Sequence, residues 1–332
     1  MARVWLNHWF STAYNIIELI KANNPGFEVV GTNERMESPI RAKCDEWFQE
    51  PVLKGRDYVN YCLEFCVDHH IDVFMPRRHM VEISKHKEEF EAQDIKVMVD
   101  DYRYVQVLNS KDKAYSLFDI DGLDVVPPHY VVNNVEDFVN AYRVLKESFK
   151  QVCFKFVRDE GGKSYRLIDN SRKGYEALFK RQTTRMTFDD AVASLSEKTP
   201  LSPLMVMPYL PGNEVSVDCL RTSAGTIAIP RVKDSSRVER VLYDEAILSK
   251  CDELLEIVPL DQPCNIQFKY LDNRLYFLEI NTRMSGGIHM SCAASGVNVP
   301  SIAVNKLLGV EEAWHLDATP RTVTQVEIPI LL

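Results

Sequence analysis

Residues 277–287 read FLEINTRMSGG, and this stretch decides the fold more than any other part of the chain. Glu279 and Asn281 are two positions apart in an apolar run typical of a strand, so their side chains share one face of it. Burying the carboxylate of Glu279 there would be costly without a cation. Arg283 follows on the same side, where it can contact a phosphoryl group. A polar strand face in water is the alternative, but the loop 285–287 (SGG) could admit a ligand.

A strand with a third polar side chain, residues 265–271 (NIQFKYL), precedes this one and is joined to it by a two-residue turn. Gln267 on this earlier strand could face the same way as the carboxylate on the next. Oxygen ligands of this kind suit Mg²⁺, which keeps waters and bridges substrate phosphates. The two strands therefore predict a magnesium site made by Gln267, Glu279 and Asn281.

Residues 152–169 (VCFKFVRDEGGKSYRLID) are typical of a strand, a loop and a second strand. Lys155 lies between two phenylalanines, so its ammonium group must point into something polar, as an anion contact or as a snorkelling lysine. In the loop, Gly161 and Gly162 allow backbone N–H groups to approach phosphate oxygens, and Lys163 and Ser164 add donors. An ordinary hairpin turn with glycines at positive φ is the alternative.

Three further segments belong to the same argument. Lys113 lies where a helix begins near Ser110, and a solvated helix lysine is its alternative. Residues 207–218 (MPYLPGNEVSVD) place a Pro-Gly break between two strands, and Glu214 beyond it could bind paired ribose hydroxyls. Residues 229–233 (IPRVK) carry alternating basic side chains, for which a solvent-exposed strand face is the alternative.

The first hundred residues alternate strand-like and helix-like patterns, which predicts a parallel sheet with helices on both faces. Ser11-Thr12 could cap the first helix, and a later helix is expected over 82–92. No GxGxxG follows the first strand, so a dinucleotide-binding redox enzyme is disfavoured. The strand-rich second part predicts an α+β region with a substantial antiparallel sheet. We expect an N-terminal α/β domain at 1–108, a lid and first lobe at 109–205, and a C-terminal lobe with the metal site at 206–332.

The composition of the chain bears on which kinds of partner it can bind. The 332 residues are 45% hydrophobic and 26% charged, with a net charge of −9 and no Lys/Arg-rich run, which argues against nucleic acid. Eight cysteines form no CxxC pair, so we expect reduced, buried thiols; Cys62 and Cys66 could hold a metal only with partners from elsewhere. No signal pattern and no apolar run of about 20 residues is present, which predicts a cytoplasmic protein without a membrane partner.

From about residue 95 to 310, the chain resembles the ATP-grasp superfamily, nearest to the carbamoyl-phosphate-synthetase-like carboxylate–amine ligases. FLEINTRMSGG is the most specific part of this resemblance, and residues 1–100 resemble the domain that precedes the grasp. The resemblance implies ATP and Mg²⁺, with the metal on Gln267, Glu279 and Asn281. It implies that Lys113, Lys155 and the loop with Gly161, Gly162, Lys163 and Ser164 contact ATP phosphates. It also implies that Met207, Tyr209 and Leu210 meet adenine, that Glu214 holds the ribose, and that Arg283 and Arg231 act on the transferred group.

The reaction implied is activation of a carboxylate as an acyl phosphate, followed by its transfer to an amine or another nucleophile with release of ADP and phosphate. The partners would be a small carboxylate and an amine, and a homodimer is compatible with this interpretation. A phosphotransferase of the same fold and a non-catalytic nucleotide-binding module are the alternatives. The loop after the first strand lacks the glycines that many relatives have, so the acceptor site is undefined.

Overall fold

The computed structural model describes residues 2–8, 11–120, 122–159, 162–171, 184–234 and 238–331. The predicted loop residue Gly161 lies outside these ranges. The chain forms two compact units. The first comprises Met1–Leu108, Asn213–Phe268 and Glu279–Leu332, and the second comprises Asn109–Gly212 and Lys269–Leu278.

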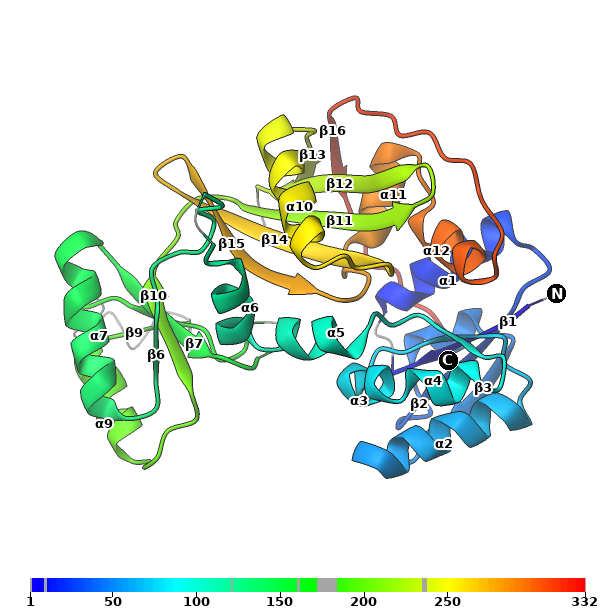
Figure 1. Ribbon diagram of the computed structural model, residues 1–332, viewed down its shortest axis with the longest axis horizontal. Coiled ribbons are helices and arrows are strands. Elements are labelled where there is room, and N and C mark those ends of the chain that lie inside the picture. The colour runs from blue at the N-terminus through cyan, green and yellow to red at the C-terminus, as the bar shows by residue number, and fades with distance from the viewer. Residues whose placement is uncertain are drawn as a thin grey trace. The chain divides into compact units, whose positions relative to one another are not determined.

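The N-terminal part of the first unit is a five-stranded sheet in the order β3-β2-β1-β4-β5, in which each pair of neighbouring strands is parallel (Figure 1). The strands are β1 (Arg3–Asn7), β2 (Glu28–Asn33), β3 (Glu46–Gln49), β4 (Val73–Met75) and β5 (Lys96–Val97). The helices are α1 (Thr12–Asn23), α2 (Gly55–Asp68), α3 (Met80–Lys85), α4 (Lys87–Glu91) and α5 (Tyr102–Leu108), with a 3₁₀ turn η1 (Pro39–Lys43).

Successive residues of β1 pack into different cores, as strand alternation requires. Val4 and Leu6 belong to the apolar cluster that contains the buried side of α1, whereas Trp5 packs with the buried side of α2. The predicted sheet with helices on both faces is therefore confirmed.

Two local expectations in this region were wrong. Ser11 makes no side-chain cap on α1; instead, Thr12 Oγ1 donates to the carbonyl of Gly286 at 3.2 Å. The helix expected over 82–92 is two short helices, α3 and α4, separated at His86.

The C-terminal lobe holds a six-stranded sheet in the order β15-β14-β11-β12-β13-β16. Its strands are β11 (Glu214–Thr222), β12 (Gly225–Lys233), β13 (Val238–Val241), β14 (Cys264–Leu271), β15 (Arg274–Asn281) and β16 (Arg321–Thr324), and its helices are α10 (Glu245–Ile257), α11 (Ile288–Ser295) and α12 (Val299–Leu307). The pairs β11–β12, β12–β13 and β13–β16 are antiparallel, as expected. Asp272 and Asn273, both at positive φ, make the tight turn between β14 and β15.

The second unit is built around a five-stranded sheet in the order β6-β10-β7-β8-β9. Its elements are α6 (Lys111–Phe118), β6 (Tyr130–Val132), α7 (Val135–Ser148), β7 (Val152–Phe156), β8 (Arg166–Ile168), β9 (Arg185–Met186), α9 (Phe188–Ser196) and β10 (Leu204–Pro208). Asn134 caps α7 by accepting from Asp137 N at 2.8 Å. The predicted strand–loop–strand is confirmed, because β7 and β8 pair antiparallel.

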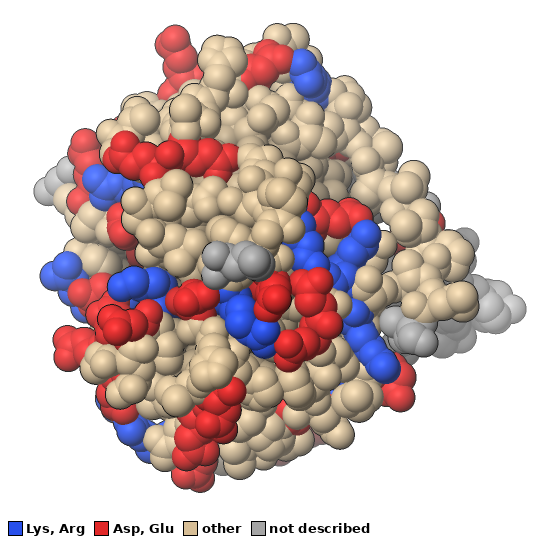
Figure 2. All heavy atoms as spheres, turned by 90° about the vertical axis from the view of Figure 1, so that its right-hand side faces the viewer, with Lys and Arg blue, Asp and Glu red and all other residues tan. Residues whose placement is uncertain are grey.

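The structure shows the state of the cysteines and the distribution of charge on one face of the protein. All eight cysteines are free, and seven of them are buried, including Cys62 and Cys66 on the buried side of α2. On the face shown in Figure 2, acidic and basic side chains are interspersed. Among the described residues, no helix is long and apolar enough to cross a membrane.

Candidate functional site

The predicted metal carboxylate lies at the end of β15 in the first unit. Asn281 Nδ2 donates to Glu279 Oε1 at 3.2 Å, so the two side chains lie on one face of the strand. Both residues are partly exposed, as is Arg283 just beyond the strand. Because the amide nitrogen of Asn281 faces the carboxylate, its oxygen is the atom left for a cation.

Gln267 lies on β14 and belongs to a chain of amide hydrogen bonds. Its Nε2 donates to Asn265 Oδ1 at 3.1 Å, and Asn265 Nδ2 donates to Asp218 Oδ1 at 3.0 Å. Carboxylate and amide oxygens at Glu279, Asn281 and Gln267 are the donor types that Mg²⁺ takes. Within the described ranges, no three side chains from His, Cys, Asp and Glu are grouped for metal binding. The oxygen donors of Glu279, Asn281 and Gln267 fit an ion that takes its remaining ligands from phosphates and water.

Arg231, on β12, is buried, with 2% of its side chain exposed. Its Nε and one terminal nitrogen donate to Asp218 Oδ2 at 3.2 and 3.1 Å, and it also pairs with Glu239. Two serine hydroxyls accept from the same guanidinium, Ser291 at 2.8 Å and Ser285 at 2.9 Å. The solvent-face alternative for residues 229–233 is wrong at this position.

Glu214, predicted to hold the ribose, begins β11 opposite Lys233 on β12. The two side chains form an ion pair and are both about one third exposed. This carboxylate is therefore near the surface, where a hydroxyl-bearing ligand can reach it.

In the second unit, Lys155 lies on β7 opposite Met205 of β10. Burial raises the pKa of the neighbouring Cys153 to about 11, and Lys155 and Lys269 both oppose that rise. Lys269 Nζ also lies 5.5 Å from the centre of the Tyr209 ring. Two ammonium groups, from Lys155 and Lys269, therefore act on the Cys153 thiol. The sequence reasoning missed Lys269, although it lies two positions after Gln267 on the same strand.

The glycine loop is tied to the start of α6. Lys111 Nζ donates to the carbonyl of Asp159 at 2.9 Å. Lys113, two residues after Lys111 on the same helix, is exposed. Ser164 N and Oγ both donate to Asp159 Oδ2, at 2.8 and 2.6 Å. The donors of Ser164 are therefore engaged within the loop, while Gly162 has a positive φ of 65°, which the hairpin-turn alternative also requires.

The chain breaks between β10 and β11 at residues 209–213, where the sequence predicted a break. Met207 in β10 and Leu210 after it are buried, and Tyr209 N donates to the carbonyl of Gln151 at 2.9 Å. Gly212 N donates to the carbonyl of Tyr270 at 3.0 Å, and a Cβ at Gly212 would lie 2.6 Å from the Cβ of Tyr270. Only glycine allows the chain to pass there.

A second polar cluster, at the carboxyl edge of the parallel sheet, was not expected. The carboxylate of Glu50 is buried and accepts from the hydroxyls of Tyr58 and Thr32. His8 Nε2 lies 3.3 Å from it and 2.9 Å from a nitrogen of Arg78. These residues follow β1, β3 and β4, at the position where the strand order reverses and open α/β sheets bind ligands. These residues come together only through the pairing of strands that are distant in the sequence, so no local sequence pattern could predict the cluster.

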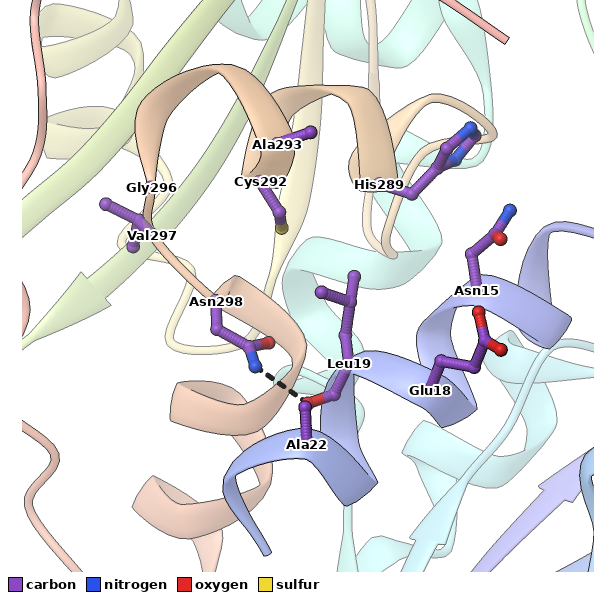
Figure 3. Close-up of a pocket in the computed structure, with 10 residues that line it drawn as sticks. All are labelled: Asn15, Glu18, Leu19, Ala22, His289, Cys292, Ala293, Gly296, Val297 and Asn298. Atoms are coloured by element: carbon purple, nitrogen blue, oxygen red, sulfur yellow. Dashed lines mark hydrogen bonds between the residues drawn. The ribbon is translucent and has the colours of Figure 1, made fainter. Parts of the chain in front are cut away.

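A cavity of about 380 Å³ lies between α1 and the α11–α12 segment, and shares no residue with the predicted site (Figure 3). Its walls include Leu19, Cys292 and Val297, and Asn298 Nδ2 donates to the carbonyl of Leu19 at 2.7 Å. Burial, with Arg231 nearby, lowers the pKa of His289 in this wall. Both effects favour the neutral form of this imidazole at a mainly apolar cavity.

Comparison with known proteins places this arrangement in context. Residues 200–328 match the family model described as ATP-grasp in the biosynthetic pathway with Ter operon. The carbamoyl-phosphate synthase of Methanobrevibacter smithii is 25% identical over 280 residues; the alignment covers 76% of this chain and 66% of that protein.

Two solved structures share the fold. N5-carboxyaminoimidazole synthetase from Staphylococcus aureus, complexed with ADP, has a TM-score of 0.72 and 15% identity, covering 98% of this chain and 82% of that one. The biotin carboxylase domain of Hydrogenobacter thermophilus 2-oxoglutarate carboxylase, in complex with MgADP and bicarbonate, has a TM-score of 0.68 and 17% identity, covering 95% and 71%.

Proposed function

We propose that this chain, whose residues 200–328 match an ATP-grasp family model, is an ATP-dependent ligase that activates a carboxylate as an acyl phosphate and joins it to an amine. The observation that carries this proposal is the end of β15, where Glu279 and Asn281 share a face and Arg283 follows. ADP in the related synthetase and MgADP in the related carboxylase domain support a nucleotide site of this fold.

In the proposed reaction, catalysis is positioning and charge stabilisation. Lys155 and Lys113 hold the phosphates, and Glu214 holds the ribose. Mg²⁺, bound by Glu279, Asn281 and Gln267, would neutralise charge on the phosphates during transfer. Arg283 stabilises the transferred phosphoryl group as a carboxylate oxygen attacks it. ADP leaves as the acyl phosphate forms. The amine then attacks the acyl carbon, the bond from that carbon to the phosphate oxygen breaks, and inorganic phosphate leaves as the amine gives up a proton.

Screening pairs of small carboxylates and amines for ADP release tests this function. A ligase releases ADP and phosphate only when both substrates are present. ADP release with one substrate and no free phosphate would instead support the phosphotransferase. Nucleotide binding without turnover over the whole panel would favour the binding module.

A further inference from the structure

The buried cluster around Arg231 is continuous with Gln267, one of the predicted magnesium ligands. Asp218 Oδ2 accepts from Arg231 and from Ser291 Oγ, the latter at 2.5 Å, while its Oδ1 accepts from Asn265. Asn265 in turn accepts from Gln267. The first three members of this relay, Arg231, Asp218 and Asn265, are each at most 2% exposed.

The chemistry of these groups fixes the direction of every hydrogen bond in the relay. A carboxylate and a main-chain carbonyl only accept. Asn265 must therefore turn its NH₂ group towards Asp218 and towards the carbonyl of Val217, 3.2 Å away. Its oxygen then faces Gln267, which must present its own NH₂ group. The amide atom of Gln267 that remains is Oε1, the atom type that Mg²⁺ binds.

We propose that Arg231 and Asp218 are positioning residues that set the amide of Gln267 in its metal-binding orientation. This inference rests on the proposed function, because it concerns the metal of that same site. Arg231 acts through the relay rather than by touching the transferred phosphoryl group, which revises the role implied by the resemblance. Burial strengthens the device, since water cannot replace any of these hydrogen bonds.

The same guanidinium holds the turn that follows Arg283. Ser285, just before α11, and Ser291, within the first half of that helix, both accept from Arg231. A Cβ at Gly287 would lie 2.2 Å from a terminal nitrogen of Arg231, so only a residue without a side chain leaves room for the guanidinium here. One buried cation therefore orients a predicted ligand on β14 and anchors the chain beyond β15.

The test is Asp218→Asn, whose amide can present either nitrogen or oxygen to Asn265 and so no longer dictates the orientation. Mn²⁺ serves as the spectroscopic probe, and its binding in the presence of ADP is measured by electron paramagnetic resonance. We expect the Kd for Mn²⁺ to rise about 10- to 100-fold, the range for losing an outer-shell partner. The affinity for ADP without metal should stay within about twofold of wild type, a margin that allows for ordinary context effects of a buried substitution.

Asp234→Asn is the matched control, because it removes an exposed partner of Arg240 in the same sheet. Asn265→Ala breaks the relay at its middle and leaves the Arg231–Asp218 pair intact, which covers the case that Asp218→Asn does not fold. Folded Asn265→Ala protein with wild-type Mn²⁺ affinity would overturn the relay while the proposed function stands. Wild-type protein that binds no Mn²⁺ with ADP would overturn the proposed function, and the relay with it.

Discussion

Asn281 Nδ2 donates to Glu279 Oε1 across 3.2 Å, which joins the two side chains that the sequence placed on one face of a strand. The bond turns the amide oxygen of Asn281 away from the carboxylate. Glu279 is the charged member of the predicted ligand set, so its carboxylate is the group expected to offset the charge of the cation.

Glu279→Gln keeps the shape of the side chain and removes its charge. We expect ADP release to fall by about 100-fold or more, because fixed charge around a transferred phosphoryl group is among the largest catalytic terms. The melting temperature should change little, since the partly buried carboxylate loses an electrostatic cost. ADP release is measured against Mg²⁺ concentration; a wild-type rate at saturating Mg²⁺ contradicts the assignment.

Lys155→Ala removes an ammonium group that acts on the neighbouring Cys153. We expect ATP to bind at least about tenfold more weakly and turnover to fall by about 100-fold, the size of one lost charge-stabilising donor. Isothermal titration calorimetry with MgATP measures the affinity. Lys150→Ala, on the exposed end of the loop before β7, is the control and should behave like wild type.

Nucleotide binding should protect the backbone amides of Gly162 and Lys163. Gly162 adopts a positive φ and Asp159 engages both donors of Ser164, so the turn is preshaped and its other N–H groups can face a ligand. Hydrogen exchange with and without a non-hydrolysable ATP analogue measures this protection. Equal exchange in both states counts against a phosphate contact by this loop.

Gly287→Ala and Gly286→Ala form a matched pair of neighbours. The new Cβ would lie 2.2 Å from a nitrogen of Arg231 in the first variant and 3.9 Å from Thr12 Oγ1 in the second. We expect about 1–3 kcal/mol of destabilisation in Gly287→Ala, as in other overpacked cores, and a markedly smaller effect in Gly286→Ala. Urea unfolding measures the stability of both variants. Equal stabilities would show that the Arg231 side chain can move to make room for the added Cβ at little cost.

Asp100 gives the pH dependence of stability a predictable component. Burial raises its pKa to about 6, although Asp261 N and Gln262 N both donate to its Oδ1. The folded state therefore holds its proton at a higher pH than the unfolded chain, with its pKa of about 3.9. The contribution of Asp100 to stability is full below about pH 4 and is lost as pH rises to about 6, by about 3 kcal/mol.

Asp100→Asn removes this titration. The difference in unfolding free energy between wild type and variant, measured from pH 4 to 7, should shift in favour of the variant as pH rises. Comparing slopes avoids the separate cost of burying the amide. A difference that stays constant with pH would show that Asp100 titrates normally.

Period-two and helical patterns, read locally, were enough to predict the parallel sheet, the antiparallel sheet and the shared face of Glu279 and Asn281. They succeed because strand geometry forces residues two apart onto one side. The same patterns could not predict that Arg231 is buried, because alternating basic residues in IPRVK are typical of a solvent-exposed strand face. Its burial depends on Asp218, Glu239 and Ser291, which reach it from other elements.

The sequence by itself determined which residue types carry the proposed chemistry and which strands present them. Only the tertiary structure decided how those groups are oriented: the amide of Gln267, the burial of Arg231, and the cluster of His8, Glu50 and Arg78 at the sheet edge. The physical reason is that hydrogen-bond direction and desolvation depend on neighbours far away in the chain. Pairing of β11 with β12, and of β1 with its neighbours, supplies those neighbours.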